Sequence, residues 1–197
     1  MSFSFKSVAV FCGASNGYQP IYQTAAIALG QLLAQHDLTL VYGGGKVGLM
    51  GTIADAVLAA GGKVVGVIPT FMQTAEVAHP NLTEMIVTES MHQRKMTMHE
   101  RSDAVIIMAG GYGTMDEFFE MLTWGQLGLH TKPMGILNTN NYYSGLLDTI
   151  VMMNQEGFLR KTYQDMVLVD EDPVLLLNKM SQYVPPTQTR LIDTTAT

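Results

Sequence analysis

Residues 104–120 read AVIIMAGGYGTMDEFFE, and this segment is the clearest indication of the fold. It opens with five apolar residues, which predict a short buried strand. The three glycines that follow leave backbone N–H groups unshielded, because glycine has no Cβ. We expect Thr114 to be the N-cap of a helix that runs to Leu127. A helix that starts directly after a buried strand is a ready site for an anion, and phosphate is the commonest one.

The same alternation of strand and helix runs along the chain. Its strands are short and apolar throughout, which is typical of a parallel sheet covered on both faces. We therefore predict an α/β fold: a single-domain, Rossmann-like, doubly wound parallel sheet whose ligand lies at the carboxyl ends of the strands. The expected strands are 7–12, 39–42, 63–68, 84–87, 104–108, 134–137 and 166–169, and the expected helices are 20–36, 49–60, 90–101, 114–127, 143–155 and 174–183.

Length and composition limit the class of protein. The 197 residues are 47% hydrophobic, which suits one nucleotide-binding α/β domain over 1–184 followed by a polar, disordered tail over 185–197. The formal net charge of −6 argues against binding to nucleic acid or to an anionic membrane. The single cysteine, Cys12, excludes an internal disulfide, and no stretch of about 18 apolar residues could span a membrane. We expect a cytoplasmic protein.

A second glycine-rich segment, Gly43-Gly44-Gly45-Lys46-Val47-Gly48, matches G-x-G-x-x-G between a strand and a helix. That pattern can mark a dinucleotide site, but such a site also has an acidic residue about twenty positions further on. The next strand here ends in Ile68-Pro69-Thr70, without an acid. Tight packing, or contact with a single nucleotide, explains the glycines better than NAD does.

Two further groups of residues have both a functional and a purely structural interpretation. Arg94 and Lys95 follow Met91 and precede the glycine motif, so they either meet an anion or form a solvent-exposed helical face. Glu117 places a carboxylate beside the expected phosphate site, yet Thr114 and Glu117 also fit the T-x-x-E capping box. His92 and His99 have no third ligand at metal-site spacing, so no metal is expected.

Taken in order, these motifs resemble those of the LOG family, the cytokinin riboside 5'-monophosphate phosphoribohydrolases that are often mislabelled as lysine decarboxylases. The resemblance runs from Val8 to about Tyr183. One position departs from the family pattern, since Ala109 stands where the family has Pro; the rigidity of the loop is more in doubt than its chemistry. The matching segments are FCGAS at 11–15, VYGGG at 41–45, GLMG at 48–51, MHQRK at 91–95, AGGYGTMDE at 109–117 and TWGQLG at 123–128.

The resemblance implies hydrolysis of the N-glycosidic bond of a purine or cytokinin nucleoside 5'-monophosphate, with AMP as the simplest substrate. It implies no metal or redox cofactor and a homodimer or higher homo-oligomer with the active site near the interface. Arg94 and Glu117 are the expected catalytic residues. The expected substrate-binding residues are Glu76, Met91, Arg94, Lys95, Gly110, Gly111, Tyr112, Gly113, Thr114, Met115, Asp116, Glu117 and Thr123. Two alternatives stay open: a non-catalytic nucleotide sensor and, less favoured, a dinucleotide-dependent oxidoreductase.

Overall fold

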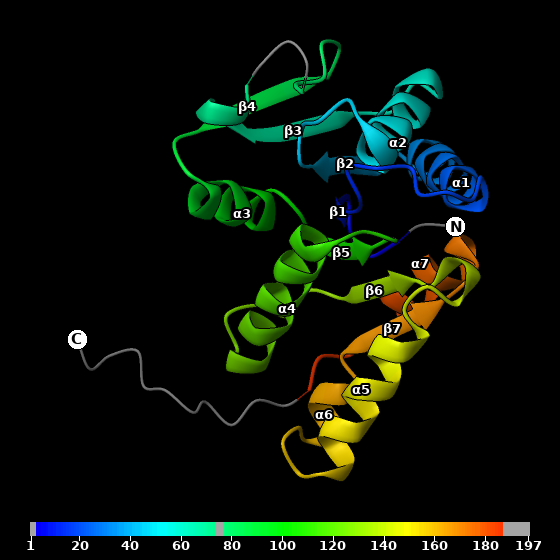
Figure 1. The fold of residues 1–197 in the computed structure, drawn as a ribbon, viewed down its shortest axis with the longest axis vertical. Helices are drawn as coiled ribbons and strands as arrows, with labels where there is room; N and C mark the ends of the chain where they lie inside the picture. The colour runs from blue at the N-terminus through cyan, green and yellow to red at the C-terminus, as the bar shows by residue number, and fades with distance from the viewer. Residues whose placement is uncertain (1–2, 74–76, 187–197) are drawn as a thin grey trace.

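The computed structural model describes residues 3–73 and 77–186. In these ranges seven strands form one sheet in the order β4-β3-β2-β1-β5-β6-β7, with every pair parallel (Figure 1). The predicted fold class is therefore confirmed. The strands are β1 (Ser7–Phe11), β2 (Thr39–Tyr42), β3 (Val64–Pro69), β4 (Glu84–Thr88), β5 (Ala104–Ile107), β6 (Met134–Leu137) and β7 (Val167–Asp170).

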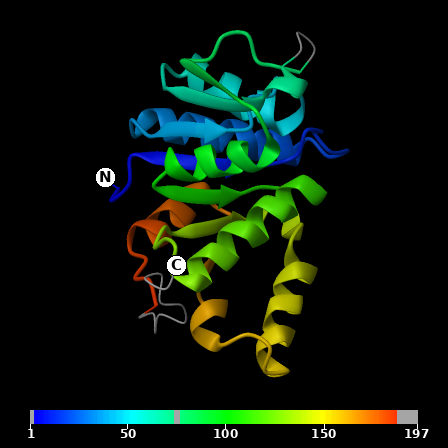
Figure 2. The same ribbon diagram turned by 90° about the vertical axis from the view of Figure 1, so that its left-hand side faces the viewer.

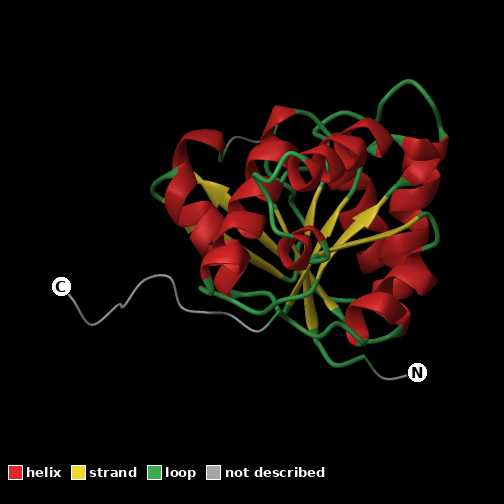
Figure 3. Cartoon of the chain, turned by 90° about the horizontal axis from the view of Figure 1, so that it is seen from below, coloured by secondary structure: helices red, strands yellow, loops and turns green. Residues whose placement is uncertain are grey.

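Helices cover both faces of the sheet (Figures 2 and 3). One face carries α1 (Ile21–Gln35), α2 (Gly48–Ala59) and α7 (Pro173–Ser181). The other carries α3 (Met91–Glu100), α4 (Tyr112–Leu127), α5 (Ser144–Gln155) and the short α6 (Lys161–Gln164), which the sequence did not predict. Two 3₁₀ turns, η1 (Thr70–Met72) and η2 (Thr139–Asn141), complete the described elements.

Side chains that alternate along the central strands build a separate core on each face. In β1, Val8 and Val10 belong to the core under α1, α2 and α7, whereas Ala9 and Phe11 belong to the core under α3, α4 and α5. A strand buried on both faces has no polar alternation, which is why these strands read as continuous apolar runs.

The order of the strands creates a crevice between β1 and β5. The chain leaves β1 toward β2 and β3 on one side, then returns through α3 to pair β5 with β1 on the other side. The loops that follow β1 and β5 therefore turn to opposite faces of the sheet. The carboxyl ends of such diverging strands are where open α/β sheets bind their ligands.

The start of α4 differs from the prediction. The helix begins at Tyr112 with Gly111 as its N-cap, and no side chain caps it. Thr114 is the third residue of the helix and is buried, so its prediction as the N-cap was wrong, and the Thr114–Glu117 capping box does not form. Gly111 serves because glycine is an acceptable N-cap and adopts this extended backbone easily. The other predicted boundaries fall within two residues of those observed.

Candidate active site

Three loops meet at the carboxyl ends of β1, β2 and β5. The Gly13 N–H donates to the Ala109 carbonyl at 2.9 Å, and the Leu49 N–H donates to the Gly13 carbonyl at 3.0 Å. Gly48 has a positive φ of 63°, and a Cβ on it would lie 2.2 Å from the Ala14 carbonyl carbon. Only glycine allows this approach, so the turn after β2 and the loop after β1 are locked together.

A cavity of about 460 Å³ opens between these loops, at the crevice between β1 and β5. Its walls are the 13–17 loop, the Ala109–Gly111 turn and the rings of Tyr22 and Tyr142. Backbone amides and aromatic rings thus face a space large enough for much of a nucleotide. Of the predicted binding residues, Gly110 and Gly111 line this cavity.

The start of α4 offers the amide groups of its first turn. The first N–H groups of a helix have no partner within the helix and lie at the positive end of its dipole. Gly110 is required just before them, because a Cβ there would lie 2.2 Å from the Thr114 hydroxyl oxygen. Tyr112 is 96% exposed, and a Cβ on Gly113 would meet only open space. Nothing in the described structure covers this turn.

Arg94 projects from α3 and is 7% exposed, so the alternative of a solvent-exposed face is wrong for this residue. Its Nε donates to the Val67 carbonyl at 2.9 Å and its Nη2 to the Gly43 carbonyl at 2.9 Å. The Val67 carbonyl lies in the second half of β3 and the Gly43 carbonyl lies just after β2. Together they hold the guanidinium in one orientation. Burial lowers the pKa of Arg94, while the Glu117 carboxylate opposes that effect. The group is fixed before any ligand arrives.

Glu117 lies on α4 opposite Arg94, with its side chain 12% exposed. Its Oε1 is 3.7 Å from Nη1 of Arg94, an ion pair longer than a hydrogen bond. Burial raises the pKa of Glu117 to about 7, and the charge of Arg94 limits the rise. This carboxyl group exchanges its proton near neutral pH, and Arg94 does not hold it in a direct hydrogen bond. Such a group suits acid–base or charge-stabilising chemistry.

The glycine motif after β2 makes room for Arg94. A Cβ on Gly43 would lie 2.1 Å from Nη2 of Arg94, and one on Gly51 would lie 2.0 Å from the Lys46 carbonyl oxygen. In a dinucleotide fold the corresponding glycines let the backbone approach a pyrophosphate. Here a side chain of the same molecule occupies the space above Gly43, so the motif is explained by packing.

Lys95 joins α3 to α4. Its Nζ lies 3.2 Å from Oδ2 of Asp116 and 3.0 Å from Oε2 of Glu120. Burial alone would lower the pKa of Lys95, but the hydrogen bonds to Glu120 and Asp116 outweigh it and raise the pKa. Both cations of the MHQRK motif therefore face carboxylates. The attraction for an anion must come mainly from the amides at the start of α4.

The other predicted binding residues divide into two groups. Met91 is near Arg94, with its sulfur 3.9 Å from Nη1. Met115, Asp116 and Thr123 line a shallow hollow of about 380 Å³ along α4, outside the crevice. Thr123 is six residues beyond Glu117, about 9 Å along the helix, and one subunit does not bring it to the glycine turn. Glu76 lies outside the described residues.

Sequence reasoning missed the loop at 13–17 and the rings of Tyr22 and Tyr142 as parts of the crevice. The FCGAS segment is a recognisable motif, but its residues do not by themselves indicate a role. The tyrosines carry no local pattern, because only the strand order brings α1 and η2 to the same edge of the sheet. The buried thiol of Cys12 lies nearby, and burial, then the charge of Glu117, raises its pKa far above the ordinary value. It is not a nucleophile.

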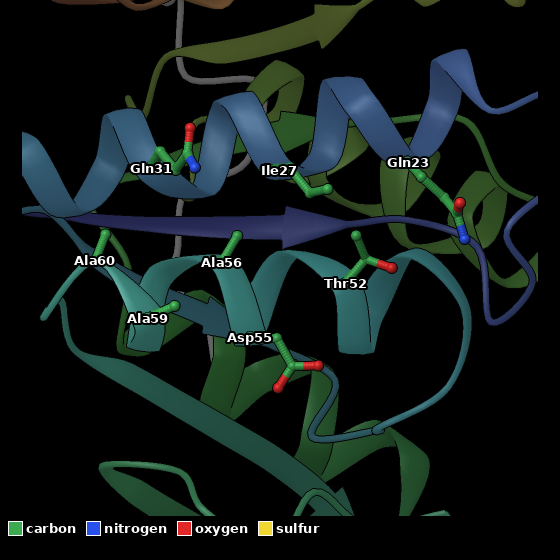
Figure 4. A pocket seen from close by; sticks show the side chains of 8 residues that line it. All are labelled: Gln23, Ile27, Gln31, Thr52, Asp55, Ala56, Ala59 and Ala60. Atoms are coloured by element: carbon green, nitrogen blue, oxygen red, sulfur yellow. The ribbon is translucent and has the colours of Figure 1, made fainter.

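A different hollow, of about 560 Å³, runs between α1 and α2 (Figure 4). It is lined by Ala56, Ala59 and Ala60 and by glutamines from α1, and its one charged group is the Asp55 carboxylate. Nothing there would attract a nucleotide anion. Among the described residues no three His, Cys, Asp or Glu side chains are grouped to hold a metal, and no described helix is long and apolar enough to cross a membrane.

Residues 50–180 match the family model described as "Possible lysine decarboxylase". The chain is 44% identical to the "Probable cytokinin riboside 5'-monophosphate phosphoribohydrolase LOGL2" of Oryza sativa subsp. japonica, over 92% of this chain and 74% of that protein. It is 43% identical to the "Cytokinin riboside 5'-monophosphate phosphoribohydrolase LOG1" of Arabidopsis thaliana, over 92% of this chain and 85% of that protein. The chain belongs to the LOG family.

A solved structure supports the fold of this LOG family member. The molybdenum cofactor binding protein of Rippkaea orientalis superposes with a TM-score of 0.68, over 89% of this chain and 95% of that one. The two share 23% sequence identity, so the likeness concerns the fold alone.

Proposed function

We propose that this LOG family member hydrolyses the N-glycosidic bond of a purine or cytokinin nucleoside 5'-monophosphate, releasing the free base and ribose 5-phosphate. The observation that carries the proposal is the buried Arg94–Glu117 pair, 3.7 Å apart, beside the start of α4, whose first turn is not capped by any side chain. Relatives named as cytokinin riboside 5'-monophosphate phosphoribohydrolases, 43–44% identical over 92% of the chain, support the same reaction.

The 5'-phosphate has a natural place at the first turn of α4. Backbone N–H groups at a helix N-terminus bind phosphate through hydrogen bonds and the helix dipole. The Gly110–Gly113 turn lets the anion approach without a side chain in the way. Binding energy from this remote group can orient the ribose for reaction.

The ribose then lies between the start of α4 and the Arg94–Glu117 pair. As the bond from C1' to the base nitrogen breaks, its electron pair leaves with the base and positive charge builds on the ribose ring. The Glu117 carboxylate stabilises that charge and orients the water whose oxygen bonds to C1'. The water's proton passes to the departing base, so the products are neutral base and ribose 5-phosphate.

Arg94 contributes to this chemistry mainly by position. Its two hydrogen bonds to the Val67 and Gly43 carbonyls leave Nη1 directed toward Glu117. A fixed cation there holds the carboxylate and assists the ribose hydroxyls or the departing base. Because the guanidinium is already desolvated and oriented, substrate binding requires no further free energy to reorganise it.

Three other functions fit less well. An oxidoreductase would need the dinucleotide fingerprint, whose space Arg94 fills. A lysine decarboxylase would need a lysine for a pyridoxal phosphate Schiff base, but Lys95 is engaged by two carboxylates. A nucleotide sensor would bind AMP without turnover, and the raised pKa of Glu117 argues for chemistry instead.

Incubation with a panel of nucleotides, with released base measured by chromatography, tests the proposal. We expect nucleoside 5'-monophosphates to be cleaved and the matching nucleosides to be cleaved far more slowly, because a nucleoside lacks the group that binds α4. Equal rates for AMP and adenosine would contradict the phosphate site. AMP that binds by calorimetry but releases no adenine would indicate the sensor.

A further inference from the structure

The connection from β6 to α5 has an unusual backbone. Asn140 and Asn141 are consecutive non-glycine residues with positive φ, 54° and 56°. Asparagine tolerates this conformation better than most residues, but two in succession still cost energy. The turn is held by Asn138, whose side-chain oxygen accepts the Tyr143 N–H at 2.8 Å. This strained turn is followed directly by Tyr142 and Tyr143, whose rings lie side by side.

Both tyrosine hydroxyls hold the segment that leads from β5 into α4. Tyr142 donates to the Gly110 carbonyl at 2.8 Å, and Tyr143 donates to the Met108 carbonyl at 2.8 Å. The two rings meet edge to face, with centroids 4.8 Å apart. Tyr143 is buried in the core, whereas Tyr142 is 46% exposed and forms a wall of the crevice with Tyr22.

The hydrogen bond from Tyr142 sets the direction of an amide at the proposed phosphate site. In a trans peptide unit the carbonyl and the following N–H point in opposite directions. Holding the Gly110 carbonyl on Tyr142 therefore directs the Gly111 N–H away from Tyr142. Glycines on both sides of this peptide would otherwise let it rotate cheaply, which would place a carbonyl oxygen where the N–H stands.

This restraint matters more here because of residue 109. A proline at that position would stiffen the entry to the turn, and this chain has Ala109 instead. We propose that Tyr142 is a positioning residue of the phosphate site: its hydroxyl fixes the Gly110–Gly111 peptide so that the start of α4 keeps its N–H groups available to the 5'-phosphate. The proposal rests on the proposed function for the identity of the anion.

Tyr142→Phe tests the role, because it removes the hydroxyl and keeps the ring that walls the crevice. We expect the KM for AMP and the inhibition constant of inorganic phosphate to rise together, by about fivefold, the usual net worth of one hydrogen bond. The kcat should stay within about twofold, because the reacting groups are untouched. The Tm should change by less than about 2 °C, since water can replace the hydroxyl on a carbonyl at an exposed ring.

Tyr143→Phe gives the contrasting variant. It leaves the Met108 carbonyl in the core without its partner, so it should lower the Tm clearly, while the remaining active protein keeps its KM for AMP. Tyr18→Phe, at a fully exposed side chain, controls for loss of a hydroxyl. If Tyr142→Phe leaves both constants unchanged, or lowers the Tm and the active fraction alone, the positioning role is wrong.

The same variants separate this inference from the proposed function. If the wild-type protein releases no base from AMP, the proposed function fails, and calorimetry with AMP and with inorganic phosphate then measures the site directly. A fivefold weaker binding of both ligands to the Tyr142→Phe variant would still support the inference. Equal binding by the two proteins, or no binding of either ligand to the wild type, would overturn it.

Discussion

Glu117 has a buried carboxyl group, and the nearby Arg94 forms no direct hydrogen bond with it. Glu117→Gln preserves the size of the side chain and removes the charge. If Glu117 stabilises the ribosyl cation, turnover of AMP should fall at least about a hundredfold, roughly 2.7 kcal/mol. Binding should survive and can tighten, because a carboxylate near a phosphate repels it. Steady-state kinetics and calorimetry measure the two quantities. Glu156→Gln, at an exposed position, is the control; a Glu117→Gln variant with the wild-type rate would end the catalytic assignment.

The raised pKa of Glu117 predicts the pH dependence of both activity and stability. Its pKa is about 7 in the folded protein and 4.5 ordinarily, so the folded state binds the extra proton. The stability that Glu117 contributes is then present below pH 4.5 and is lost as the pH rises through 7. The kcat should rise over the same interval, because the carboxylate is the active form. The free energy of unfolding by denaturant and the kcat for AMP, each measured between pH 5 and 8, check the two predictions. If the free energy of unfolding of the wild type and of Glu117→Gln changed with pH in parallel, the assignment of this pKa to Glu117 would be contradicted.

Arg94 shows what residue type and spacing leave undecided. The sequence predicted a cation near the site, but the sequence of a helix does not show whether an Arg side chain contacts solvent, a ligand or the backbone. The structure buries Arg94 against the carbonyls of Val67, within β3, and Gly43, just after β2. Those partners are 27 and 51 residues away, so only the assembled sheet defines them.

At the scale of elements, the turn after β2 is fitted to Arg94, and this can be tested. Gly43→Ala would place a methyl group 2.1 Å from Nη2 of Arg94. Arg94 must then leave the Gly43 carbonyl and lose its alignment with Glu117. We expect at least a tenfold loss of kcat/KM for AMP and a loss of about 1–3 kcal/mol in stability, as for other overpacked sites. A change in stability with unaltered kinetics would show that the orientation of Arg94 does not matter.

Gly145→Ala is the matched control for that variant. Gly145 lies in the first turn of α5, and a Cβ there meets nothing within 4 Å. Alanine is the better helix former, so the control should keep full activity and equal or slightly higher stability. Thermal unfolding and AMP kinetics are measured for Gly43→Ala and Gly145→Ala together. The comparison distinguishes the effect of any Gly→Ala change on stability and activity from the effect of displacing Arg94.

The elements that the sequence predicted best are those that periodicity defines. Buried parallel strands are apolar runs, and the helices between them carry a clear spacing, so both were located to within two residues. The start of α4 was predicted two residues too late, because the T-x-x-E pattern by itself indicates an N-cap at its threonine. In the structure Gly111 is the N-cap, and Thr114 is buried beneath the turn. The four-residue α6 is too short to show a period. The wall of tyrosines in the crevice arises from strand order, which no local pattern records.

In the molecule as a whole, the binding residues that we predict do not all line one hollow of a single subunit. Thr123, which the family resemblance assigns to the substrate, lies in a hollow along α4 that the crevice does not reach. The net charge of −6 also gives a small anion no general attraction to the surface. Local amides must therefore recognise the phosphate, and a second copy of the chain is the simplest way to enclose the rest of the nucleotide.

We predict a homodimer whose interface includes the surface around α3 and α4. Met91, Phe119 and Leu129 are large apolar side chains, 37%, 37% and 61% exposed, on or just after these helices. Exposed apolar side chains near a binding site are common at protein interfaces. We predict a particle of twice the 21.5 kDa chain mass, measured by light scattering at micromolar concentration. Phe119→Asp should yield monomers and lower kcat/KM for AMP at least tenfold, whereas Val151→Asp, at a comparably exposed position on α5, should leave the mass unchanged. A wild-type monomer that cleaves AMP at full rate would show that one subunit suffices.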